Sequence, residues 1–327
     1  MPYAGRVLVI GHRGAPGYRP EHTRSSYEFA ISRGADAVEP DVVVSGDGVL
    51  VIRHEPEISG TTDVADRPEF ADRRTTKRFA GYEFSGWFVD DFTWDELARL
   101  RARERLPRLR PESAALDGTE PILRLRDLLE IVRAESEARG RRIEVTLEIK
   151  HAVYYDSLGW DVAELVADEL AGFQDDVDVV FESFEPTILD RLRARGIRAE
   201  YMLLVDDTGA PLDLAVSMGA AAPEYRSYLT PEGLDALVGR VDGLSVNKTL
   251  ILADDGLRTV AEIHARGLRV FTWTARPENE FLDPRFRIGS DPAAFGDWRG
   301  EWALIRDAGV DGVFVDHTDL GVEFFRS

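Results

Sequence analysis

The 327-residue sequence contains no cysteine. Disulfide bonds and thiolate zinc sites are therefore excluded, whatever the redox compartment of the protein. It also lacks any apolar run that approaches the roughly 18 residues of a membrane-spanning helix. Hydrophobic residues nevertheless make up 44% of the chain, and charged residues 31%. This composition can fill a core and is not that of a disordered protein.

Positive charge is scarce. The chain has 40 basic and 60 acidic residues, and its formal net charge is −20. This balance argues against a nucleic-acid partner, because a phosphate backbone requires a basic surface. An anionic substrate would need a local island of positive charge, which a bound metal ion could supply. Only three of the basic residues are lysines, Lys77, Lys150 and Lys248. Where arginine is the usual cation, a lysine points to a need for a compact point charge.

The sequence shows neither a signal peptide nor a membrane-binding patch. The N-terminal region has only the short apolar run at 7–10, which leads directly into a polar segment. We therefore expect no signal peptide and a cytoplasmic protein, or a secreted one if a signal has been removed. No basic or amphipathic apolar patch predicts stable membrane association. The oligomeric state is not predicted.

Short β-rich segments alternate with amphipathic helical ones. A βαβα series of this kind predicts a parallel sheet covered by helices. Eight strand candidates fit a (β/α)8 TIM barrel of the α/β class. An open doubly wound sheet is the alternative, but no GxGxxG or P-loop pattern supports it. The eight predicted strands are Arg6–Gly11, Asp36–Asp41, Ile143–Ile149, Asp178–Ser183, Arg198–Val205, Gly243–Val246, Leu268–Trp273 and Asp311–Val315.

Three segments interrupt the alternation. Residues 42–44 and 49–52 flank a Ser-Gly-Asp-Gly turn, which predicts a hairpin because a parallel crossover needs about a dozen residues. Residues from about 57 to 120 are polar, arginine-rich and irregular, and form an insertion after this hairpin. Residues 276–300 form a long loop rich in proline and glycine. We interpret residues 1–327 as a single barrel domain whose long loops shape its site.

Carboxylates gather at the predicted strand ends. The active site of a parallel barrel lies at the carboxyl ends of its strands. Glu39 and Asp41 are two residues apart, so their side chains share one face of a strand. Glu148 and Lys150 repeat this spacing on another strand. The three carboxylates predict an all-oxygen site for one divalent cation, Ca²⁺ or Mg²⁺.

Two histidines flank this predicted metal site. His12 follows the first strand and His54 follows the hairpin. Because imidazole titrates near neutral pH, the two suit a general acid/base pair. Arg13 offers a planar fork to a phosphoryl oxygen, and Lys150 offers a point charge. A metal ion, two histidines and two cations at one mouth can stabilise charge on a phosphoryl group and transfer protons, which is what phosphodiester cleavage requires.

Other polar residues near the strand ends have a structural interpretation. His22 and Thr23 are expected to start the following helix, with Thr23 as its N-cap. Glu182 and Asp316 are expected to be structural, and His264 lies in a helical pattern away from the site. Trp273 suits either the core or a ligand platform.

The order of these residues resembles the glycerophosphodiester phosphodiesterase family, in its longer bacterial branch. The resemblance runs from about residue 6 to 319, so it covers nearly the whole chain. Its individual motifs are short, but their combination is specific. They are GHRGAPGYRPEHT, EPD, VLVIRHEP, LEIK, ESFE, FTWTARPEN and DGVFVD.

The resemblance implies a metal-dependent hydrolase of glycerophosphodiesters such as glycerophosphocholine, releasing an alcohol and sn-glycerol 3-phosphate. By it, His12 and His54 are the acid/base pair, and the metal ligands are Glu39, Asp41 and Glu148. Arg13 and Lys150 would contact the phosphate, and Trp273 the glycerol. Two positions depart from the family: His22 replaces the usual Asn, and Val315 replaces the Thr before Asp316. Two rival functions are cleavage through a cyclic phosphate and a catalytically silent phosphodiester-binding barrel.

Overall fold

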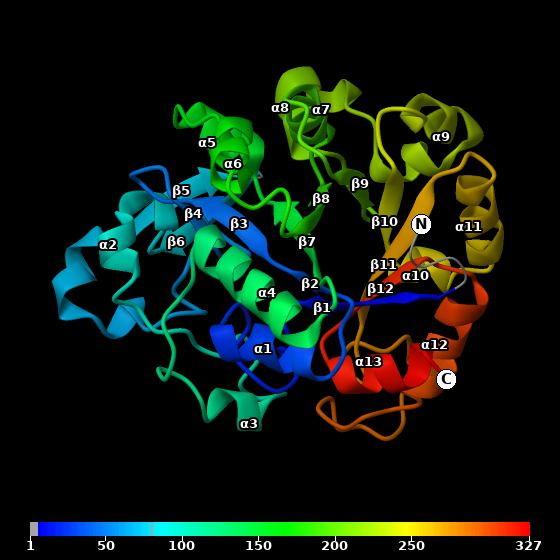
Figure 1. Cartoon of the computed structure of the whole chain (residues 1–327), viewed down its shortest axis with the longest axis horizontal. Helices are drawn as coiled ribbons and strands as arrows, with labels where there is room; N and C mark the ends of the chain where they lie inside the picture. The colour runs from blue at the N-terminus through cyan, green and yellow to red at the C-terminus, as the bar shows by residue number, and fades with distance from the viewer. Residues whose placement is uncertain (1–5, 80) are drawn as a thin grey trace.

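A computed structural model describes residues 6–79 and 81–327, and they form a closed barrel of parallel strands (Figure 1). The strands follow one another around the barrel, and pairing of β2 with β7 closes it. The predicted (β/α)8 fold is confirmed. The barrel strands are β1 (Leu8–His12), β2 (Ala37–Glu39), β7 (Glu144–Ile149), β8 (Asp178–Ser183), β9 (Glu200–Val205), β10 (Gly243–Asn247), β11 (Arg269–Ala275) and β12 (Gly312–Val315).

The second barrel strand is divided at Pro40. β3 (Asp41–Val44) continues it, and both parts pair with β7. Proline has no backbone N–H to donate to the ladder, which explains a break of one residue there. After β3 the chain reverses direction, and β4 (Leu50–Ile52) pairs antiparallel with β3. The predicted hairpin is therefore confirmed.

Side chains alternate between the inside and the outside of the barrel. Leu8, Ile10, Phe271 and Phe314 belong to a small interior cluster, whereas Val9 belongs to the large core beneath the helices. The inward face of β1 continues from Leu8 and Ile10 to His12, since residues two apart share a face. One inward face thus supplies an apolar plug below and polar groups at the mouth.

Helices cover the outside of the barrel. Thr23 caps the first of them, as predicted, by accepting a hydrogen bond from the Ser26 backbone N–H. No helix among the described residues is both long and apolar enough to cross a bilayer. The outer helices are α1 (Arg24–Ser32), α4 (Leu125–Arg139), α5 (Ala152–Ser157), α6 (Val162–Leu170), α7 (Pro186–Ala194), α8 (Leu212–Met218), α9 (Pro231–Leu237), α10 (Lys248–Ile251), α11 (Gly256–His264), α12 (Trp298–Asp307) and α13 (Thr318–Phe325).

The insertion is more ordered than its sequence indicates. It contains a hairpin of β5 (Thr75–Phe79) and β6 (Tyr82–Gly86) and two short helices, α2 (Trp94–Leu97) and α3 (Pro111–Ala114). β5, β6 and α2 lie together on one side of the barrel (Figure 1). Both hairpin strands are largely exposed, so they lack the apolar alternation that would have revealed them.

Candidate active site

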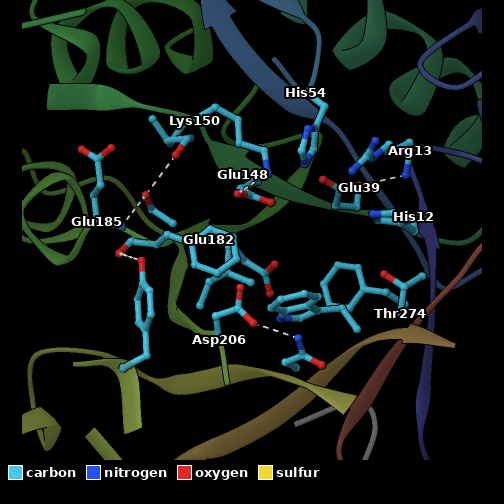
Figure 2. A pocket seen from close by; sticks show the side chains of 18 of the residues that line it. His12, Arg13, Glu39, His54, Glu148, Lys150, Glu182, Glu185, Asp206 and Thr274 are labelled. Carbon is cyan, nitrogen blue, oxygen red and sulfur yellow. Dashed lines mark hydrogen bonds and ion pairs between the residues drawn. The ribbon is translucent and has the colours of Figure 1, made fainter. Parts of the chain in front are cut away.

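A cavity of about 730 Å³ opens at the carboxyl ends of the strands. Its lining includes His12, His54, Lys150 and Trp273. Figure 2 shows the labelled His12, Arg13, Glu39 and His54 grouped on one side of this cavity, with Glu185 and Asp206 on the other. This is the end of a parallel barrel at which enzymes of the fold place their chemistry.

Strand register brings the polar residues together. His12 on β1 pairs with Glu39 on β2, and Asp41 on β3 pairs with Glu148 on β7. Glu148 in turn pairs with Glu182 on β8. Paired positions on neighbouring strands lie side by side, so an acidic row runs around one arc of the mouth.

Glu39, Asp41 and Glu148 form a compact acidic group. One carboxylate oxygen of each lies within 4.8 Å of the other two, and all three residues are buried. Glu39 Oε1 has no hydrogen-bond partner, whereas Asp41 Oδ1 and Glu148 Oε1 share the Lys150 ammonium as their ion-pair partner. Three buried carboxylates so close together are costly, and a hard divalent cation would satisfy this set. The three residues therefore fit a metal site.

The charge balance of this group favours a bound cation. Burial, followed by the neighbouring Asp41, raises the pKa of Glu39 well above its usual range. Burial likewise raises the pKa of Glu148 to about 8, although Lys150 acts against it. Burial acts in the same direction on Asp41, but Lys150 and Arg13 hold its pKa well below its usual range. The nearby cations therefore compensate the charge of Asp41, but they do not fully compensate the charges of Glu39 and Glu148.

Lys150 and Arg13 both approach the acidic group. The Lys150 ammonium nitrogen lies 2.5 Å from Glu148 Oε1 and 3.1 Å from Asp41 Oδ1, as an ion pair with each. The Arg13 Nε lies 3.4 Å from Asp41 Oδ2, and its backbone N–H donates to Glu39 Oε2 at 2.8 Å. These are the two cations that the sequence assigns to phosphate, and both line the cavity.

His12 is held from behind by Asp316. The His12 Nδ1 lies 2.7 Å from Asp316 Oδ1, and Asp316 is fully buried. Burial opposes ionisation of Asp316, but Arg276 and Arg110 keep its pKa well below its usual range. An ionised carboxylate can only accept, so Nδ1 carries the proton. Burial and Arg13 lower the pKa of His12 to about 4, so the ring is neutral.

His54 has a similar partner in the next residue. Its Nδ1 lies 2.5 Å from Glu55 Oε1. Burial would raise the pKa of Glu55, but His54 and Arg105 hold it below its usual range. Burial, Arg13 and Lys150 lower the pKa of His54 to about 3. Both histidines are therefore neutral, with Nδ1 bound to a carboxylate and Nε2 left for the cavity that they line.

Trp273 lies next to Phe184 in the wall of the cavity. Its indole N–H donates to the Ser245 carbonyl oxygen at 3.1 Å, and a cis peptide bond joins it to Thr274. The Phe184 ring meets it edge to face, with 5.6 Å between centroids. Trp273 is half-buried and lines the cavity, so it is accessible to a ligand.

Several residues behave differently from the expectation. Asp316 is ion-paired with Arg110 and Arg276, as a structural residue would be, but it also contacts His12 directly. His22 does more than precede a helix, because its Nε2 lies 2.9 Å from Asp41 Oδ2. Glu182 lines the cavity and its Oε1 has no hydrogen-bond partner. His264 bonds to Asp311 and does not line the cavity, in agreement with the sequence.

Apart from Asp316, the predictions from the sequence include none of the residues that support the two histidines. Glu55 could have been found, because it directly follows His54. Arg105, Arg110 and Arg276 lie in the two long loops, where no periodicity predicts the direction of a side chain. Their roles depend on the path of those loops in space.

Comparison with known proteins identifies the family of the chain. The model of the glycerophosphoryl diester phosphodiesterase family matches residues 12–320. The chain belongs to this family. It is 30% identical to a glycerophosphodiester phosphodiesterase of Arabidopsis thaliana, over 96% of this chain and 84% of the relative. A glycerophosphodiester phosphodiesterase of Treponema pallidum is also 30% identical, over 98% and 92% of the two chains.

A solved structure gives the same fold. The Oleispira antarctica phosphodiesterase in complex with the product sn-glycerol-3-phosphate superposes with a TM-score of 0.64. It is 22% identical, and the match covers 99% of each chain. The family member described here is accordingly a phosphoric diester hydrolase on a TIM barrel.

Proposed function

We propose that the protein hydrolyses glycerophosphodiesters, such as glycerophosphocholine and glycerophosphoethanolamine, to an alcohol and sn-glycerol 3-phosphate. One observation carries the proposal: three clustered, buried carboxylates lie at the same mouth as two neutral, carboxylate-backed histidines. The Oleispira antarctica relative, which holds sn-glycerol-3-phosphate as its product, supports this choice of product.

Glu39, Asp41 and Glu148 would hold one divalent cation, Ca²⁺ or Mg²⁺. Such an ion supplies Lewis-acid stabilisation of negative charge on a phosphoryl group. Lys150 and Arg13 add fixed positive charge at the same place. The overall charge of −20 makes this local concentration of cations important, because the rest of the surface repels a phosphodiester.

The two histidines suit opposite proton transfers. Each is neutral and offers an Nε2 lone pair, so either could accept a proton from the attacking water. As water forms a new bond to phosphorus, the bond from phosphorus to the alcohol oxygen breaks. The other histidine first takes up a proton from solvent, and it gives this proton to the departing alcohol oxygen. The first histidine afterwards releases its proton to solvent, so over a cycle one proton is taken up and one is released.

The far wall of the cavity suits a cationic headgroup. Glu182, Glu185 and Asp206 line it, and among the described residues none of the three has an ion-pair partner within 4.0 Å. Lys248 lines the cavity too, but its ammonium lies 2.6 Å from Glu301 Oε1. Phe184 and Tyr225 add aromatic surface. Carboxylates with aromatic rings favour choline or ethanolamine over an anionic headgroup.

Residues 1–327 would act as one catalytic domain. The insertion at about 57–120 supplies Tyr82 to the cavity, and the loop at about 276–300 supplies Arg276 and Phe281. Both long loops therefore contribute to the mouth of the barrel, as expected of functional loops in a compact domain.

The decisive experiment measures glycerol 3-phosphate released from glycerophosphocholine. The protein is treated with EDTA, and Ca²⁺ or Mg²⁺ is then restored. We expect release to stop with EDTA and return with one of the ions. Phosphorus NMR of the reaction distinguishes hydrolysis from cleavage through a cyclic phosphate. Binding of the substrate without turnover at any concentration of either ion would favour the silent binding barrel instead.

A further inference from the structure

Two arginines of the insertion lie behind the two histidines. Arg110 donates from Nη2 to Asp316 Oδ2 at 2.6 Å, while Asp316 Oδ1 faces His12. Arg105 donates from Nη1 and Nη2 to the two oxygens of Glu55, at 2.8 and 2.6 Å, and Glu55 faces His54. The two carboxylates, Glu55 and Asp316, come from opposite ends of the chain, yet one short turn of the insertion reaches both.

Each arginine is itself fixed on a second carboxylate. Arg105 Nε lies 2.8 Å from Glu21 Oε2, and its Nη2 lies 2.6 Å from Glu21 Oε1. Arg110 Nε donates to Glu278 Oε1 at 2.9 Å. A guanidinium bound on two sides loses its freedom to turn, so it fixes the carboxylate that it holds.

The turn that carries these arginines is internally braced. The buried Glu104 accepts from the Leu106 backbone N–H at 2.8 Å and from the Ser113 hydroxyl at 2.6 Å. The Arg110 backbone N–H donates to the Leu106 carbonyl oxygen at 2.9 Å. The backbone between the two arginines is thereby held in place, so their separation is fixed.

Neither arginine reaches the cavity, so neither is positioned to touch substrate. We propose that Arg105 and Arg110 are positioning residues, which orient the two catalytic histidines through Glu55 and Asp316. This inference rests on the proposed function. It makes the insertion a part of the catalytic machinery, since it keeps both Nδ1 protons bound and both Nε2 atoms directed to the cavity.

The test replaces each arginine by glutamine and follows both turnover and the histidine rings. We expect Arg105→Gln and Arg110→Gln each to lower kcat on glycerophosphocholine by about 10- to 100-fold, as loss of outer supporting residues commonly does. KM should stay within about twofold, because the cavity wall is unchanged. Arg108→Gln is the matched control: Arg108 lies exposed in the same turn, and its replacement should alter neither parameter.

Nitrogen-15 NMR of histidine-labelled protein separates positioning from simple stability. Arg110→Gln should shift the Nδ1 signal of His12 and leave that of His54, while Arg105→Gln should do the reverse. Arg110 is buried, so Arg110→Lys provides a second variant that keeps the charge but loses the fork. It should recover part of the lost kcat and part of the lost His12 shift.

Two results would overturn the proposal. One is that the folded variants keep wild-type kcat and unchanged histidine signals. The other is that each variant disturbs both histidines equally and lowers kcat only in proportion to a fall in Tm. The NMR measurement needs no turnover, so it gives its answer even if the wild-type protein hydrolyses no glycerophosphodiester, which would instead contradict the proposed function.

Discussion

The two ends of the barrel use carboxylates in opposite ways. At the amino end, Asp36, Asp242 and Asp311 each precede a barrel strand. Each accepts a backbone N–H from a neighbouring strand, at 2.8–3.0 Å: from Val9, Tyr201 and Val270, respectively. Each also has a cationic or histidine partner. These carboxylates join adjacent strands.

At the carboxyl end the corresponding acids are less well satisfied. Glu39, Asp41, Glu148 and Glu182 are buried. Glu39 Oε1 and Glu182 Oε1 have no hydrogen-bond partner, and Asp41 Oδ1 and Glu148 Oε1 share one ammonium, that of Lys150. Such groups cost stability, and they persist where a ligand completes them. The amino end of this barrel therefore serves stability, whereas the carboxyl end keeps oxygens available for a cation and a substrate.

The largest effect should come from replacing the two histidines of the carboxyl end, in comparison with the histidine of the amino end. His12→Ala or His54→Ala should lower kcat by about 10²–10⁴-fold, the usual contribution of general acid/base groups. The fold should survive both changes, as circular dichroism would show. His264→Ala, at the amino end, is the control and should leave kcat unchanged. Full activity without His12 and His54 would remove the basis of the acid/base assignment.

Neutralising one carboxylate at each end should give opposite results. Glu39→Gln should reduce kcat by more than about 100-fold and raise the Tm of the EDTA-treated protein, because it relieves uncompensated buried charge. Asp242→Asn should leave kcat unchanged and lower the free energy of unfolding by about 1 kcal/mol, through a weaker hydrogen bond to Tyr201. Calorimetry and turnover assays measure both. A lower Tm for the EDTA-treated Glu39→Gln protein would contradict the proposed difference between the two ends of the barrel.

Two buried glutamates of the mouth, Glu148 and Glu185, should make the metal-free protein less stable as pH rises. Burial raises the pKa of Glu185 to about 8, as it does that of Glu148. An unfolded glutamate releases its proton near pH 4.3, so between about 4.5 and 8 the native state binds more protons. Stability must then fall with rising pH, by at most about 1.4 kcal/mol per unit for each group.

Urea unfolding at several pH values measures this slope. Glu185→Gln should flatten it in the presence of EDTA, since the amide does not titrate. Saturating Ca²⁺ or Mg²⁺ should remove the contribution of Glu148 to this pH dependence, because the bound ion would keep its carboxylate ionised. A slope that Glu185→Gln leaves unchanged would show that this carboxyl is not the source.

The smallest effect concerns the headgroup. Asp206→Asn should lower the preference for glycerophosphocholine over an uncharged glycerophosphoglycerol headgroup by about two- to fivefold in kcat/KM, as expected for a partly exposed charge. Asp207→Asn is the matched control, because Asp207 does not line the cavity. Equal effects of the two changes would argue against a specific role for Asp206.

The barrel and the residues at its mouth can be predicted from the sequence alone. Strand candidates separated by helical patterns indicate the parallel sheet, and alternation decides which side chains share a face. Periodicity and spacing are therefore enough to place Glu39 with Asp41, and Glu148 with Lys150, at one edge of the sheet. These signals are local: they span a few residues, and their periods follow from backbone geometry.

The groups behind the histidines depend on the tertiary structure. His12 and Asp316 are 304 residues apart, and Arg110 reaches them from a turn without any periodic pattern. Register between β1 and β12 brings the ends of these two strands together, and the folded path of the insertion aims Arg105 and Arg110. No short-range pattern encodes such contacts, because a long guanidinium side chain can point in many directions until packing and paired carboxylates select one.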